Sequence, residues 1–189
     1  MIRIGILGDI GSGKSFVAKN FGYPVFNADY EVIKIYKSDK KVFGKLKKLF
    51  PQQISSFPIN KKEITKIILD KNSNLKKIIQ IIHKEVRKKM NIFINKNKHK
   101  KIVILDIPLL LENKINQKKD ILIFVDSKKK DILQRLVKRR NFNKKLFDRF
   151  KEIQFSAAFK KKRSQFTIQN NYKKKTLKRD IKIILNQIL

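Results

Sequence analysis

MIRIGILGDIGSGKSFVAKNF, residues 1–21, contains the pattern that decides the fold. Its first residues form a short apolar strand. Residues 8–15 (GDIGSGKS) match G-x-x-x-x-G-K-[ST] in full, and Phe16, Val17 and Phe21 continue at helical spacing. A strand, a glycine-rich loop and a helix in this order predict a P-loop that binds the phosphates of a nucleotide.

Each part of the predicted P-loop has a chemical role. Glycine lets backbone N–H groups converge on one point, Lys14 reaches the β- and γ-phosphates, and the Ser15 hydroxyl holds Mg²⁺. ATP and Mg²⁺ are therefore the expected ligands. The residues expected to contact ATP here are Gly8, Asp9, Ile10, Gly11, Ser12, Gly13, Lys14, Ser15 and Phe16.

The composition suits one α/β domain with inserted substructures, because 189 residues at 41% hydrophobic content can build a sizeable core. The chain has no cysteine, which excludes disulfides and thiol chemistry and fits a reducing compartment. It has no apolar run of about 18 residues, and its first strand is not the pattern of a signal peptide. We expect a cytoplasmic protein without a membrane partner, as a monomer or weak homo-oligomer.

The net charge of +33 raises the alternative of a non-catalytic P-loop protein that binds nucleic acid. The lysines are spread along the chain, however, and over-use of Lys, Asn and Ile is typical of an AT-rich coding sequence. The phenylalanines follow apolar periodicity and do not form a stacking platform. We therefore expect no specific nucleic-acid partner.

A second strand around Val25 ends in Asn27-Ala28-Asp29. Ligands of open parallel sheets bind at this strand edge, where Asp29 is placed to accept a hydroxyl proton or to hold Mg²⁺ through water. Asp is also a preferred helix N-cap, and the sequence leaves both interpretations open.

Residues 30–98 are expected to form a helical insertion. The pattern predicts helices over 30–50 with a break at Ser38–Asp39, a loop over 51–60, and helices over 61–70 and 74–95. His83 lies in this insertion, where a lone histidine is more often structural than a ligand.

The strand over 101–106 ends in Asp106, which is expected to orient Mg²⁺ or its water shell, as the carboxylate of a Walker B strand does. The apolar run over 107–111 either lines an acceptor site or packs in the core. A further strand is predicted over 120–126.

Residues 127–163 are expected to form basic helices that resemble the mobile lid of small P-loop kinases. Arg135 and Arg139 are four residues apart and are placed on one helix face, with Arg140 beside them. Such arginines clamp phosphates, although solvated surface arginines are the alternative.

The last predicted elements are a strand over 166–170, which ends in Asn170, and a helix over 177–189. The expected fold is a three-layer α/β P-loop fold with a central parallel sheet. Its expected parts are a nucleotide-binding core (1–29, 99–126 and 164–189), the helical insertion (30–98) and the lid (127–163).

This order of motifs resembles dephospho-coenzyme A kinase over nearly the whole chain. The shared features are the P-loop, N-A-D (27–29), a His-bearing helix, L-D-I-P-L-L-L-E (105–112), F-V-D followed by Q-R-L-V-K-R (124–139), and I-Q-N-N (168–171). The resemblance implies that ATP phosphorylates the 3′-hydroxyl of dephospho-coenzyme A. Another small-molecule kinase, such as one acting on nucleoside monophosphates, remains an alternative.

The resemblance also implies roles for individual residues. Asp29 matches the proposed general base, with Lys14 and the lid residue Arg139 as further catalytic groups, and Asn170 lies on the adenine side. Residues implied at the acceptor are Asp29, His83, Asp106, Pro108, Leu109 and Leu110. The departures from the family pattern are Asp9 for Gly, Asn27 for Asp, Lys84 for Pro, Arg140 for Asp and Gln169 for Asp. Lys14, Asp29 and Asp106 are all retained, so we expect an active enzyme.

Overall fold

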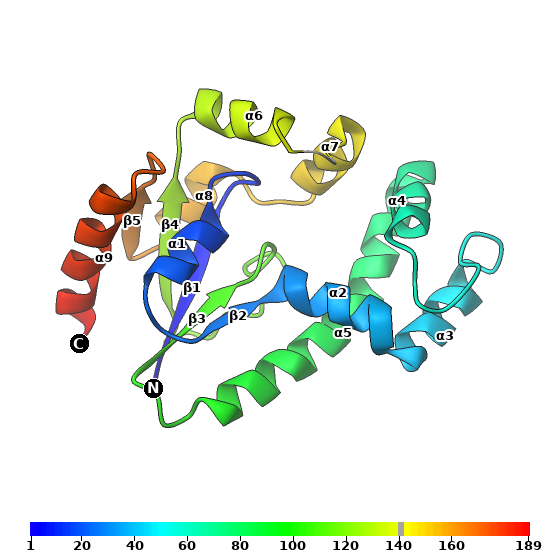
Figure 1. The fold of residues 1–189 in the computed structure, drawn as a ribbon, viewed down its shortest axis with the longest axis horizontal. Coiled ribbons are helices and arrows are strands. Elements are labelled where there is room, and N and C mark those ends of the chain that lie inside the picture. Colours follow the sequence, from blue (N-terminus) through cyan, green and yellow to red (C-terminus); the bar gives the residue numbers. More distant parts are fainter. Residues whose placement is uncertain (140–141) are drawn as a thin grey trace. The chain divides into compact units, whose positions relative to one another are not determined.

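The computed structural model describes residues 1–139 and 142–189, which form two compact units (Figure 1). The sheet unit comprises Met1–Asn27, Ile94–Phe142 and Gln154–Leu189. The helical unit comprises Ala28–Phe93 and Asn143–Ile153. Both units are assembled from segments that are far apart in the sequence.

The sheet unit is built on five parallel strands in the order β2-β3-β1-β4-β5. The strands are β1 (Ile2–Gly8), β2 (Val25–Asn27), β3 (Ile102–Asp106), β4 (Ile121–Asp126) and β5 (Phe166–Gln169). β1 lies in the middle, so the loop that follows it leaves the sheet at the point where the strand order changes direction. Ligands of open parallel sheets bind at such points.

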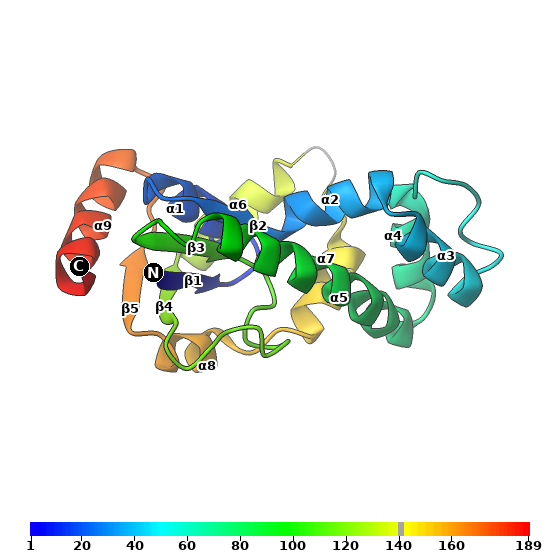
Figure 2. The ribbon, with the colours of Figure 1, turned by 90° about the horizontal axis from the view of Figure 1, so that it is seen from below.

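Helices cover both faces of this sheet (Figures 1 and 2). α1 (Lys14–Asn20) and α9 (Lys174–Ile188) lie on one face, and α8 (Ala157–Lys162) lies on the other. The apolar residues of β1, β3 and β4 pack against Val17 of α1 and Ile181 of α9. The expected three-layer α/β fold is confirmed.

A buried ion pair joins the start of β1 to the segment before β4. Both Arg3 and Asp120 are buried, and Arg3 Nε lies 3.0 Å from Asp120 Oδ1. Burial raises the pKa of the Asp120 carboxyl, and the Gln117 N–H and the Arg3 guanidinium oppose that shift.

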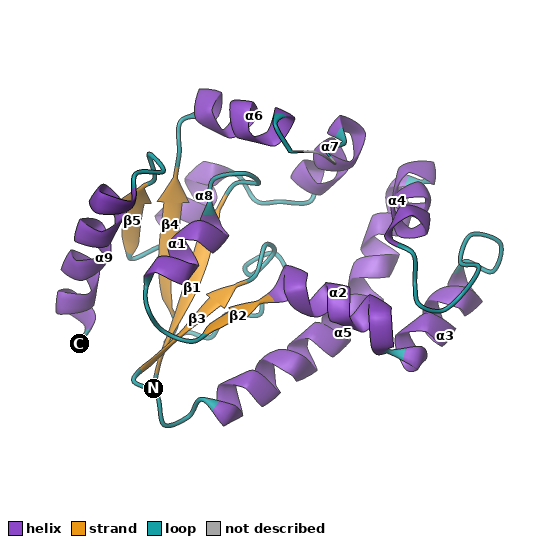
Figure 3. Ribbon diagram, in the orientation of Figure 1, coloured by secondary structure: helices purple, strands orange, loops and turns teal. Residues whose placement is uncertain are grey.

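The helical unit contains α2 (Ala28–Ser38), α3 (Lys40–Leu49), α4 (Lys61–Asp70), most of α5 (Asn72–Lys96) and α7 (Lys144–Glu152), whereas the strands in Figure 3 belong to the sheet unit. Local chemistry sets the helix starts. The Asp39 carboxylate accepts a hydrogen bond from Val42 N–H (3.0 Å), and the Asn60 side chain caps α4 in the same way. The predicted break near residues 38–39 is therefore present.

The structure differs from the expected layout of residues 127–163 at two points, while the role of this stretch as a lid stays a prediction. α7 packs on α4 and belongs to the helical unit, so this stretch is not one structural segment. α6 (Lys129–Val137) ends before Arg139, so Arg139 does not share a helix face with Arg135. Beyond Val137 the hydrogen bonding tightens, because the Arg139 N–H donates to the carbonyl oxygen of Leu136, only three residues back (3.1 Å).

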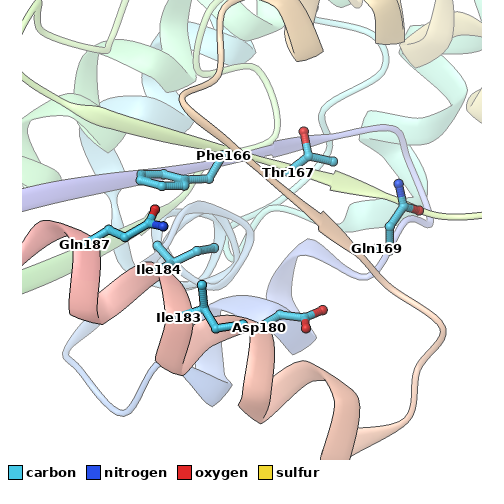
Figure 4. A pocket seen from close by; sticks show the side chains of 7 residues that line it. All are labelled: Phe166, Thr167, Gln169, Asp180, Ile183, Ile184 and Gln187. Carbon is cyan, nitrogen blue, oxygen red and sulfur yellow. The ribbon is translucent and has the colours of Figure 1, made fainter.

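A groove of about 400 Å³ lies between β5 and α9 (Figure 4). It is lined by Phe166, Thr167, Gln169, Asp180, Ile183, Ile184 and Gln187. These residues lie outside the predicted site. In the part of the chain that the structure describes, no helix is long and apolar enough to cross a membrane.

Candidate active site

The P-loop (residues 8–15) leaves β1 and turns directly into α1. Its glycines are required by their conformation, since Gly11 and Gly13 have φ values of 88° and 89°. A Cβ on Gly13 would also collide with the Asn170 amide and the Tyr172 ring. These two side chains therefore pack closely against the loop, and any larger residue at Gly13 would force the loop to move.

Three side chains from two other segments hold the carbonyl oxygens of the P-loop. The Ser12 oxygen accepts hydrogen bonds from Asn170 Nδ2 (2.8 Å) and Ser127 Oγ (2.9 Å). The Gly11 oxygen accepts one from the Tyr172 hydroxyl (2.9 Å). Fixed carbonyls hold the loop in one conformation, and such a loop presents its N–H groups to a ligand without a cost in ordering.

The three helix residues predicted to bind ATP differ in their surroundings. The Lys14 ammonium donates to the carbonyl oxygens of Gly8 (3.1 Å) and Asp9 (2.8 Å). Ser15 is exposed, so its hydroxyl is accessible, whereas the Phe16 side chain packs against the core. Only the backbone of Phe16 is therefore suited to contact a nucleotide.

Asp106 lies at the carboxyl end of β3, with Asn27 opposite it in the register of β2. The carboxylate is only 3% exposed, and its Oδ2 accepts a hydrogen bond from Asn27 Nδ2 at 2.5 Å. Carboxylate and hydroxyl oxygens are ligands that Mg²⁺ prefers, so the donor set of Asp106 and Ser15 fits this ion.

Among residues 1–139 and 142–189, no group of three or more His, Cys, Asp or Glu side chains could hold a metal.

A family model for dephospho-CoA kinase matches residues 2–176 of the chain. The chain belongs to the dephospho-CoA kinase family.

A relative matches this chain along nearly its whole length, and solved structures share its fold. A dephospho-CoA kinase from Wolbachia sp. subsp. Brugia malayi is 35% identical over 98% of this chain and 97% of its own length. The crystal structure of TT1252 from Thermus thermophilus has a TM-score of 0.77 at 25% identity, covering 100% of this chain and 98% of that one. The structure of a dephospho-CoA kinase from Campylobacter jejuni shares the fold, with a TM-score of 0.60 at 20% identity, covering 98% of this chain and 96% of that one.

In this dephospho-CoA kinase family member, the apolar run after β3 is mainly core. Leu109 and Leu110 are buried, and Leu110 is 0% exposed and packs against the backbone of Gly5. Pro108 is only partly covered. The burial of Leu110 favours packing in the core over lining an acceptor site. A role of Leu110 at the acceptor stays a prediction.

The remaining predicted residues lie in three different segments of the chain, and they are Asp29, His83 and Arg139. Asp29 lies in the first turn of α2, which begins at Ala28, and is not the residue before the helix. His83 is half-buried on α5, and both residues belong to the helical unit. Arg139 is exposed just beyond α6 in the sheet unit, and Arg140 lies outside the described residues.

Sequence reasoning missed several residues around the P-loop, namely Ser127, Tyr172 and Lys160. Lys160 is buried and lies beside the Asp9 carboxylate. The Asn170 side chain supports the loop, and its place on the adenine side stays a prediction. One sequence pattern points to Tyr172, because this residue directly follows I-Q-N-N. Its hydrogen bond to Gly11, however, joins residues far apart in the sequence and forms only in the folded chain.

Proposed function

We propose that this protein transfers the γ-phosphoryl group of ATP to the 3′-hydroxyl of dephospho-coenzyme A, giving coenzyme A and ADP. The observation that carries the proposal is the P-loop at the end of β1, held by Ser127, Asn170 and Tyr172 in a chain of this family. This reaction would be the last step of coenzyme A biosynthesis.

The phosphates of ATP would lie against the N–H groups of residues 8–15. Lys14 would exchange its two carbonyl contacts for the β- and γ-phosphates, where its charge stabilises the transferred group. Mg²⁺, when bound, neutralises phosphate charge and orients the γ-phosphoryl group. Ser15 and Asp106 would hold this ion, with Asn27 fixing the orientation of the Asp106 carboxylate.

Asp29 is the proposed general base, which would accept the proton of the attacking 3′-hydroxyl. Asp29 lies in the first turn of α2, directly after the strand β2. Arg139 would stabilise charge on the phosphoryl oxygens. The proposed contacts of the acceptor are His83, Pro108 and Leu109. The insertion proposed to bind the acceptor comprises residues 30–98, and the proposed lid comprises residues 127–163.

Acceptor-dependent release of ADP tests the proposal. The protein is incubated with ATP and Mg²⁺, with dephospho-coenzyme A, with a nucleoside monophosphate, or with no acceptor. We expect ADP only with dephospho-coenzyme A, and we expect Lys14→Ala to lower the rate by about a hundredfold or more. ADP release that is the same with and without dephospho-coenzyme A would contradict the proposal, and a preference for the monophosphate would identify a different kinase.

A further inference from the structure

The sheet unit contains a buried lysine that the proposed mechanism does not use. Lys160 in α8 is 2% exposed. Its ammonium lies 3.5 Å from Asp9 Oδ1, 3.9 Å from Glu112 Oε1 and 3.3 Å from Gln154 Oε1. A lysine is almost never fully buried unless its charge is paired, so this arrangement needs an explanation.

Asp9 brings a negative charge into a loop that has to accept a polyphosphate. Its side chain is 47% exposed, and the Lys160 ammonium is its ion-pair partner. Its backbone carbonyl oxygen accepts a hydrogen bond from Lys14 (2.8 Å). One residue of the P-loop is therefore in contact with two lysines, one through its backbone and one through its side chain.

The same ammonium also lies beside the loop that follows β3. Glu112 is largely buried, and its Oε1 accepts a hydrogen bond from the Phe155 N–H (2.9 Å). Gln154 donates to the Pro108 carbonyl oxygen (3.5 Å). Lys160 thus places one positive charge between two carboxylates, one on the P-loop and one on the loop beside Asp106.

We propose that Lys160 is a positioning residue for nucleotide binding, which neutralises Asp9 and holds its carboxylate against α8. The inference rests on the proposed function, because it concerns the nucleotide at the P-loop. Without the ammonium, the ionised Asp9 carboxylate stays partly exposed in the loop and repels the nucleotide phosphates. Asp9, which departs from the glycine of the family pattern, is tolerated because Lys160 accompanies it.

Binding of ADP and Mg²⁺, measured by isothermal titration calorimetry, tests the inference without any acceptor. Lys160→Met removes the charge but keeps a long side chain, and we expect it to weaken ADP binding about fivefold at low salt. Lys160→Arg keeps the charge and should bind ADP as wild type does. In an Asp9→Asn background, Lys160→Met should have little effect, because no carboxylate is left at position 9.

Lys161→Met is the matched control, since Lys161 is 53% exposed, contacts Asp126 at 3.4 Å and carries the same charge one residue away. We expect it to leave ADP binding unchanged, and thermal unfolding confirms that each variant is folded. If Lys160→Met does not fold, the test of the inference rests on Asp9→Asn alone. The inference then requires Asp9→Asn to bind ADP at least as tightly as wild type.

Three results would overturn the inference: unchanged binding in Lys160→Met, equal weakening in the Asp9→Asn background, or equal weakening in Lys161→Met. Failure of the wild type to bind ADP would overturn the proposed function together with the inference. Binding by the wild type that Lys160→Met does not alter would overturn the inference alone.

Discussion

Asn27 and Asp106 show how one side chain sets the charge of the site. They lie side by side at the ends of β2 and β3, and the amide donates to the carboxylate. Where the family pattern has a second carboxylate, this chain has a neutral donor. The pair therefore lacks the repulsion that two adjacent carboxylates would have.

Asn27→Asp tests this interpretation, because it replaces the hydrogen bond with repulsion between two carboxylates. We expect a loss of about 2 kcal/mol in the free energy of unfolding without Mg²⁺, and partial recovery when Mg²⁺ is added. Urea denaturation with and without Mg²⁺ measures both effects. Asn60→Asp is the control, since its side chain needs only an acceptor, for the Lys62 N–H. Equal stability of Asn27→Asp and Asn60→Asp would contradict the interpretation.

Asp29→Asn tests the proposed general base. The amide keeps the size of the side chain but cannot accept the hydroxyl proton, so we expect kcat to fall by about a hundredfold or more. KM for ATP should change little, because the phosphates are bound by residues 8–15. Steady-state kinetics with dephospho-coenzyme A measure both constants. Near-normal kcat would show that Asp29 is not the base.

At the scale of secondary structure, the Arg3–Asp120 pair connects two elements of the sheet unit. Its atoms are buried, so each partner depends on the other for its charge to be neutralised. Such pairs often add little net stability, but the loss of one partner leaves a buried charge without compensation.

We expect Arg3→Met to lower the free energy of unfolding by about 3 kcal/mol, because Asp120 is left buried and unpaired. The double variant Arg3→Met, Asp120→Leu should recover most of that loss. Urea denaturation of wild type, both single variants and the double variant measures the coupling. Additive losses in the double variant would show that the two residues do not depend on each other.

Local sequence patterns predicted most elements correctly, for identifiable reasons. The strands are apolar runs that end in polar residues, as at Asp106 and Asp126, and α4 has Asn60 as its cap. The P-loop pattern predicted the phosphate-binding turn because its residues are contiguous.

Tertiary contacts account for what the sequence could not show. α7 belongs to the helical unit because it packs on α4, and no pattern within residues 144–152 signals that partner. Likewise, Tyr172 and Lys160 meet the P-loop only when the chain has folded. Apolar spacing also could not decide whether Leu110 faces a ligand or the core.

The charge of the whole molecule is its most unusual property, with 48 Lys and Arg residues against 15 Asp and Glu. Excess positive charge attracts polyanions at long range, which would speed the arrival of ATP and would also retain RNA. The lysines occur in helices of both units and not in one segment, so the charge itself favours attraction without sequence recognition.

We expect RNA to bind this protein weakly and without sequence preference. Fluorescence anisotropy with two unrelated RNA oligonucleotides should give similar affinities at low salt, and both should fall steeply as salt increases. An affinity about a hundredfold higher for one sequence, retained at physiological salt, would instead indicate a specific nucleic-acid function.

Identification of the product tests the proposed function most directly. ATP, Mg²⁺ and dephospho-coenzyme A are incubated with the protein, and the purified product is compared with authentic coenzyme A by mass spectrometry and ³¹P NMR. We expect one added phosphoryl group, located on the ribose 3′-hydroxyl, and no such product with Lys14→Ala. A phosphoryl group at another position, or unchanged dephospho-coenzyme A while ATP is consumed, would contradict the proposed function.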